Sequence, residues 1–292
     1  MELIYNNYIR ASGHGDAFRV DFELPTTSNY NYFEICKDLA TQLYDERQGQ
    51  LYLMYSGGVD SEFVLNVFLS LNIPITPVII KLGYNDHDVK YAFDFCTSKN
   101  LTPLVIDFDF DTFVKSGKIV DIATQYKIAA YQLPSTFSVL TQLDGTIVMG
   151  SHGPAHIKKY NDVWYLDEYE PIWTVLDYFK QNKLHGCPFF LIHRAEQYAT
   201  FLNDPLMKEL ADNKIPGKLG SNSSKWIIYN KLAPFDLVER TKYTGYEHVE
   251  QQPIFQHENM QWFKTVEKQW WGNHRIPFTD VLSRLDENKN NI

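Results

Sequence analysis

Cysteine is scarce in this chain of 292 residues, which contains only Cys36, Cys96 and Cys187. The three are widely spaced, and no Cys-x-x-Cys pair occurs. This spacing argues against a structural zinc site, an iron–sulfur cluster or a disulfide framework. We therefore interpret each cysteine as a small buried apolar residue and not as a catalytic thiol.

Long apolar runs and long basic runs are also missing. The apolar stretch 75–82 is interrupted by Pro77 and Lys81 and is too short for a membrane helix, and residues 1–7 do not resemble a secretory signal. The formal net charge is -9, and short basic pairs such as Lys158-Lys159 do not make a nucleic-acid groove. We expect a soluble, cytoplasmic protein with no membrane partner, and the charge disfavours a nucleic-acid substrate.

What the chain does have is a hydrophobic fraction of 44%, enough for a large core. Apolar strands are predicted at 51–55, 77–82, 104–108 and 147–150, with amphipathic helices at 62–71 and 88–98. This alternation predicts an α/β fold in which helices cover both faces of a parallel sheet. We expect a small strand-and-helix extension (1–48), an α/β nucleotide-binding core (49–160) and a mainly helical C-terminal region packed on it (161–292).

The segment Ser56-Gly57-Gly58-Val59-Asp60-Ser61 joins the first core strand to the next helix. Adjacent glycines let the backbone turn tightly and approach a ligand closely. The unpaired amides at the start of the helix point into the loop and carry a partial positive charge, which suits a phosphate. In a parallel sheet this position also lies beyond the carboxyl ends of the strands, where ligands bind. An ordinary structural turn is the alternative.

This hexapeptide resembles SGGxDS, the PP-loop signature of the ATP pyrophosphatases (adenine nucleotide alpha-hydrolase-like superfamily), and lacks the lysine of a Walker A loop. The resemblance implies a HUP-like, Rossmann-like fold that binds ATP and Mg²⁺. It also implies that Asp60 binds the magnesium ion and takes part in catalysis. The residues that it assigns to the nucleotide are Tyr55, Ser56, Gly57, Gly58, Asp60 and Ser61.

The end of the second core strand is similar to the synthetase domain of asparagine synthetase. There, a strand ending near a glycine is followed by an Asp-x-x-x-Ala helix, which Asp88 would open in this chain. The resemblance implies that Lys81 and Leu82 lie against the adenine ring. Helix N-capping is the favoured explanation of Asp88, and it needs no ligand.

The strand that ends at Gly150 also resembles this branch, which places Ser151 and His152 at the nucleotide. The chain departs from the family here, because Pro154-Ala155 stand where the family has Asp-Glu, with the Asp on magnesium. The nearest polar replacements are His152, His156 and Lys158. A second carboxylate could come from Asp162, Asp167 or Glu168, or lysines could supply part of the charge, and the sequence leaves these alternatives open.

The stretch Glu239–Tyr246 is similar to the Arg-Lys-Lys-x-Gly-Phe segment of asparagine and beta-lactam synthetases. By this resemblance Lys242, three residues before Gly245, would be catalytic and would stabilise developing negative charge. A solvated basic loop is the alternative.

Together these features predict an ATP-dependent, AMP-forming ligase or amidotransferase-like enzyme that adenylates a carboxylate or amide oxygen of an unidentified small molecule. Glu2 stands where a glutaminase would have its nucleophilic cysteine, and 48 residues are too few for a glutaminase domain. We therefore expect the amine nitrogen to come from free ammonia, another amine or a partner protein. A nucleic-acid base-modifying PP-loop enzyme and a non-catalytic nucleotide-binding module are the alternatives.

Overall fold

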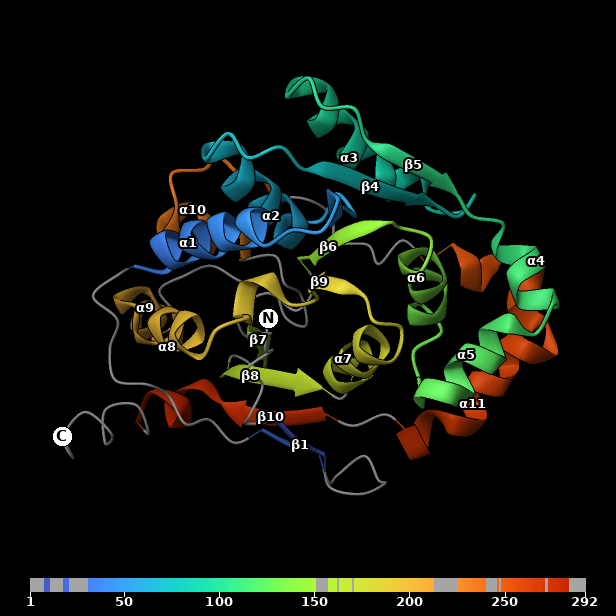
Figure 1. The fold of residues 1–292 in the computed structure, drawn as a ribbon. Helices are drawn as coiled ribbons and strands as arrows, with labels where there is room; N and C mark the ends of the chain where they lie inside the picture. Colours follow the sequence, from blue (N-terminus) through green and yellow to red (C-terminus); the bar gives the residue numbers. More distant parts are fainter. Residues whose placement is uncertain are drawn as a thin grey trace.

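The main structural unit is a five-stranded parallel sheet surrounded by helices (Figure 1). The structure is a computed structural model. It describes residues 8–10, 18–20, 31–150, 157–161, 163–169, 171–212, 225–239, 246, 248–270 and 273–283. The predicted α/β class is confirmed.

The strands of this sheet lie in the order β5 (Leu104–Asp107), β4 (Thr76–Lys81), β3 (Gln50–Met54), β6 (Gly145–Met149) and β9 (His185–Cys187). Every neighbouring pair is parallel, and Tyr52 of β3 lies between Thr76 and Ile147. Residues 146–149 of β6 are all buried, so both faces of the sheet are covered at its centre. The four core strands predicted from apolar runs are therefore confirmed.

In the described residues before β6, six helices precede or connect the strands. Their bounds are α1 (Tyr32–Asp45), α2 (Val59–Ser70), α3 (Asp86–Ser98), α4 (Phe110–Lys115), α5 (Lys118–Tyr126) and α6 (Leu133–Leu140). Two have side-chain caps, because Asn31 accepts from the Glu34 amide and Asp109 from the Thr112 amide, each at 2.9 Å.

The predicted start of α3 at Asp88 is wrong by two residues. The helix begins at Asp86 after Asn85, so Asp88 lies within the first turn and is not the cap. Asn85 does not cap the helix with its side chain either. Its amide bridges the end of β4, accepting from the Leu82 N–H and donating to the Ile80 carbonyl, each at 2.9 Å. This bridge fixes the turn after β4.

The described part of the C-terminal region contains the helices α7 (Pro171–Gln181), α8 (Ala195–Asn203), α9 (Pro205–Ala211), α10 (Lys225–Leu232) and α11 (Glu258–Trp270), in agreement with the helical region that the sequence predicted. Short 3₁₀ turns η2 (Phe190–Ile192), η3 (Val249–Gln251) and η4 (Pro253–Gln256) lie between them. Strands β7 (Ile157–Tyr160), β8 (Val163–Tyr169) and β10 (Asn273–Pro277) form an antiparallel sheet, which the sequence did not predict. Strands β1 (Tyr8–Arg10) and β2 (Phe18–Val20) form a separate antiparallel pair.

Strand β9 adds the fifth parallel strand although its three residues follow the predicted end of the core at residue 160. Gly186 allows this strand to approach its neighbour closely. A Cβ at this position would stand 1.9 Å from the Ile147 carbonyl oxygen. The parallel sheet therefore draws on both the middle and the C-terminal part of the chain.

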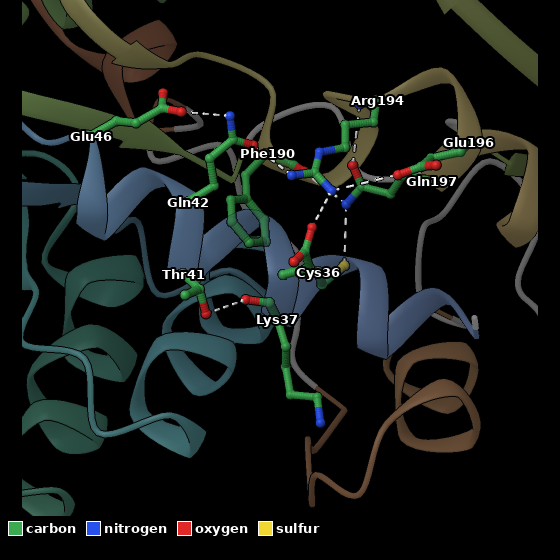
Figure 2. Close-up of polar contacts among 10 residues, drawn as sticks. Cys36, Lys37, Thr41, Gln42, Glu46, Phe190, Arg194, Glu196 and Gln197 are labelled. Atoms are coloured by element: carbon green, nitrogen blue, oxygen red, sulfur yellow. Dashed lines mark hydrogen bonds and ion pairs between the residues drawn. The ribbon is translucent and has the colours of Figure 1, made fainter. Parts of the chain in front are cut away.

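Helix α8 is held against α1 by a cluster of polar side chains (Figure 2). The Arg194 guanidinium contacts the Asp38 carboxylate at 2.6 Å and the Gln42 amide oxygen at 2.5 Å. Beside it, the Gln197 amide donates to the buried Cys36 sulfur at 3.1 Å and to the Phe190 carbonyl at 2.9 Å. Because α1 also contacts α2, the cluster supports the helix that carries the candidate site.

Within the described parts of the chain, every helix is too short or too polar to cross a bilayer.

Candidate functional site

The loop between β3 and α2 is organised by its own serines. The Ser56 hydroxyl accepts from the Gly58 N–H at 3.2 Å and lies 3.3 Å from the Ser61 hydroxyl, which donates to the Gly58 carbonyl at 2.9 Å. Gly58 is the N-cap of α2 and, having no side chain, makes no side-chain cap. As at the start of any α-helix, the first-turn amides of this 12-residue helix have no intrahelical partner, and Gly58 offers them no side-chain acceptor.

Two glycines in the predicted site are required by close packing. Gly57 has a φ of +79°, and a Cβ there would stand 2.9 Å from the Ala92 amide nitrogen of α3. Gly150 follows β6 directly, and a Cβ there would stand 2.7 Å from the Cα of Ser61. The structure therefore brings Ser56, Gly57, Gly58, Asp60 and Ser61 together with Gly150 at the carboxyl end of the sheet, as the sequence predicted.

Asp60, in the first turn of α2, is bound by two side chains of α10. The Lys225 ammonium donates to Oδ2 at 2.7 Å, and the Tyr229 hydroxyl donates to Oδ1. Only 8% of the Lys225 side chain and 25% of the Asp60 side chain are exposed, so the ion pair is largely shielded from water. Burial, and then the negative charge of Asp60, raise the pKa of Tyr229 well above its ordinary value, which keeps the hydroxyl protonated as a donor.

Sequence reasoning missed both residues of α10. Lys225 and Tyr229 are four residues apart and therefore share one face of the helix, which lies beside α2 (Figure 1). The phenyl ring of Phe63 stacks on Tyr229 with centroids 4.6 Å apart and fixes that face on α2. The available signal was a lysine and a tyrosine at helical spacing. Nothing in the sequence connects them to Asp60, which lies 165 positions before Lys225 and 169 before Tyr229.

Tyr55 was predicted to bind the nucleotide, but its side chain lies in the core. The residue is 1% exposed, and its hydroxyl donates to the buried Glu62 carboxylate at 3.0 Å. Its ring contacts Phe95 of α3, with centroids 6.0 Å apart. The side chain of Tyr55 therefore supports the packing of α2 and α3, and only its backbone is left to border the loop.

Lys81 and Leu82, predicted to border the adenine ring, lie at the carboxyl end of β4. The Lys81 carbonyl accepts from the Phe108 N–H at 2.7 Å, and the Leu82 N–H donates to Asn85. The half-exposed Lys81 ammonium lies 3.9 Å from the Asp107 carboxylate, and Leu82 is buried. The Lys81 carbonyl and the Leu82 N–H are therefore already bonded within the protein. An adenine contact here would have to use the Lys81 side chain or the remaining backbone groups.

Several predicted residues lie outside the described parts of the chain. These are Ser151, His152, Pro154, Ala155, His156, Asp162, Lys242 and Gly245. Tyr246, which follows the Lys242 segment, is described and buried. Its hydroxyl bonds to the buried Ser135 of α6 and donates to the Gln132 carbonyl at 3.3 Å.

The donor set around Asp60 does not fit a magnesium ion held by the protein. Magnesium favours octahedral oxygen coordination, usually with one or two carboxylates, and a cation stands 2.7 Å from one oxygen of this carboxylate already. Among the described residues, no three His, Cys, Asp or Glu side chains come together as a metal site. Asp167 and Glu168, which the sequence left open as ligands, lie in β8, opposite β10 in the antiparallel sheet.

Comparison with protein-family models and with curated proteins finds no match to this chain.

Proposed function

We propose that this protein is an ATP-dependent, AMP-forming ligase or amidotransferase-like enzyme that uses the Ser56–Ser61 loop to hold the phosphates of ATP. The observation that carries the proposal is the loop itself. Two glycines, of which Gly57 packs closely on α3, lead into an α-helix that begins without a side-chain cap, at the carboxyl end of a parallel sheet. The likeness of the loop to the PP-loop signature supports ATP as the nucleotide.

The proposed reaction has two steps. A carboxylate oxygen of the co-substrate attacks the α-phosphorus of ATP, the bond between the α-phosphorus and the bridging oxygen breaks, and pyrophosphate leaves. An amine then attacks the acyl carbon and loses a proton, and AMP leaves with its oxygen. Because negative charge grows on the departing pyrophosphate, the site must supply positive charge and hold the attacking oxygen in line.

The residues of this chain supply the holding groups. The amides at the start of α2 are oriented toward the phosphates, and Ser56 and Ser61 keep the loop in shape through their hydroxyl contacts. Magnesium enters the proposal as the counter-ion that ATP carries on its phosphates. The amine is free ammonia, another small amine, or ammonia from a partner protein.

Pyrophosphate exchange tests the proposal. The protein is incubated with ATP, magnesium, radiolabelled pyrophosphate and pools of small carboxylates, and label entering ATP is measured. Since adenylation is reversible, the pool that contains the co-substrate should produce labelled ATP. The contrary result is a protein that binds ATP but shows no exchange in any pool and forms no AMP when amines are present. That result would contradict the ligase proposal and favour a nucleotide-binding module.

Lys242→Ala tests the catalytic role that the resemblance gives to Lys242, which is to stabilise the negative charge that develops during the reaction. Loss of the charge that stabilises the leaving group should reduce AMP formation by at least about 100-fold, in the range of a lost transition-state contact. ATP affinity, measured by calorimetry, should change little. Lys231→Ala is the matched control, because Lys231 lies on α10 in an exposed ion pair with Glu209. An equal loss of binding and turnover in Lys242→Ala would give Lys242 only a supporting role in the fold.

A further inference from the structure

Lys225 places a positive charge at the start of α2. Its ammonium pairs with a first-turn carboxylate of that helix, in the turn whose amides are directed at the candidate phosphate site. Residue 225 is 7% exposed, which is unusual for lysine. A buried ion pair of this kind adds little net stability, because desolvation of the two charges offsets their attraction. The pair therefore calls for a reason other than stability.

Toward the residues that the structure describes, the ammonium also has unused donor capacity. A lysine has three N–H donors, and within the described part of the chain Asp60 is the acceptor that bonds to Lys225. Tyr229 donates to the other oxygen of Asp60 and so fixes the carboxylate that orients the lysine. A further acceptor arriving at the helix terminus would meet a lysine that is already desolvated and held in position.

We propose that Lys225 is a pyrophosphate-binding residue of this site, positioned by Asp60, and that its charge stands in for magnesium held by the protein. The inference rests on the proposed function, since it concerns the same phosphates. It follows from the poor fit of Asp60 to a metal ion, since the Lys225 ammonium stands 2.7 Å from the carboxylate oxygen that a metal ion would use. Asp60 is then a positioning residue, and the ammonium with the helix amides forms the anion site.

Binding of inorganic pyrophosphate in the presence of EDTA, measured by isothermal titration calorimetry, tests the inference without magnesium or turnover. Lys225→Gln should weaken the affinity by about 10- to 100-fold, as expected for a lost hydrogen bond to a charged group. Lys231→Gln, on the same helix and paired with the exposed Glu209, should bind like the wild type. Asp60→Asn should bind at least as well as the wild type, because it removes a negative charge beside the anion.

The outcomes separate the two proposals. Wild-type protein that binds neither pyrophosphate nor ATP would overturn the proposed function and this inference with it. Wild-type binding that Lys225→Gln leaves intact would overturn the inference alone. Pyrophosphate binding that requires magnesium and is lost in Asp60→Asn would also overturn the inference alone, because it would make Asp60 the metal ligand.

A second comparison keeps the test decisive if Lys225→Gln does not fold, since removing one partner leaves a buried charge unpaired. Asp60→Asn is then compared with the double variant Asp60→Asn/Lys225→Met, which has no charge at either position. The same 10- to 100-fold loss is expected between these two proteins. Equal pyrophosphate affinities would overturn the inference.

Discussion

Gly150 shows how one residue joins the sheet to the candidate site. A methyl group at this position would meet the Cα of Ser61 at 2.7 Å and its amide nitrogen at 3.1 Å, both of them backbone atoms. The end of β6 and the start of α2 would have to move apart. The glycine is therefore required by close approach of two backbones and not by a turn.

Gly150→Ala should consequently lower the free energy of unfolding by about 2–3 kcal/mol, the upper part of the range for overpacking. Gly58→Ala is the matched control. Gly58 has an ordinary φ of -73°, and a Cβ there would meet only the Ser56 hydroxyl, at 3.2 Å, so we expect a loss below about 1 kcal/mol. Urea denaturation measures both, and equal losses would contradict the packing described for Gly150.

His193 makes stability depend on pH. Burial, reinforced by the positive charge of Arg194, lowers the pKa of His193 to about 4, whereas nearby Glu46 acts in the opposite direction. An unfolded histidine titrates near pH 6.5. Below that pH the unfolded chain binds a proton that the folded protein does not, so stability falls as the pH falls from about 6.5 to about 4.

Between pH 7 and pH 5 this histidine should reduce the free energy of unfolding by about 2 kcal/mol. The measurement is urea denaturation at the two pH values for the wild type and for His193→Gln. The variant should lose less stability than the wild type over this interval. An identical loss in both proteins would show that His193 is not the source.

At the scale of elements, the contact between α1 and α8 depends on Arg194, whose side chain is 21% exposed. Arg194→Met keeps the apolar stem and removes the contacts to Asp38 and Gln42, so it should cost about 1–2 kcal/mol of unfolding free energy. Lys37→Met removes an ion pair within α1, with Glu34, and should cost less than about 0.5 kcal/mol. Thermal and urea unfolding check both, and similar effects would contradict the role of Arg194.

Elements with strong local patterns were predictable, and those defined by distant partners were not. The apolar runs of β3, β4 and β6 belong to strands buried in the sheet, and so they are visible in sequence. Strand β9 has three residues, and its position depends on Gly186 meeting Ile147. In the antiparallel sheet, β8 pairs with β10, which lies more than 100 residues further along the chain. Local periodicity carries no signal for such pairing.

The same distinction applies to the candidate site. The loop is one continuous segment, so its residues and their position at the end of β3 could be inferred from glycines, an apolar strand and a helical pattern. The partners of Asp60 on α10 could not be inferred from the sequence, because α10 reaches α2 only through the tertiary fold. The side chain of Tyr55, the residue after β3, turned out to serve the core, because its partners Glu62 and Phe95 lie on helices that the fold brings to it.

At the scale of the whole molecule, the three cysteines report on the integrity of the core. All three are buried, which confirms their interpretation as interior residues. Burial raises the pKa of Cys36 to about 12 and that of Cys96 to about 11, and it also raises the pKa of Cys187. A thiol reagent such as DTNB should therefore leave the native protein unlabelled for hours at pH 8 and label three thiols in guanidinium chloride. Rapid labelling of the native protein would contradict this core.

The central claim is that the Ser56–Ser61 loop holds ATP for cleavage at its α-phosphorus. The most direct test incubates the protein with ATP labelled at the α-phosphate, magnesium, and pools of carboxylates and amines, and then separates the nucleotides. The account predicts labelled AMP and an equal amount of pyrophosphate, with no labelled ADP. Labelled ADP as the product, or no binding of ATP at any concentration tested, would contradict it.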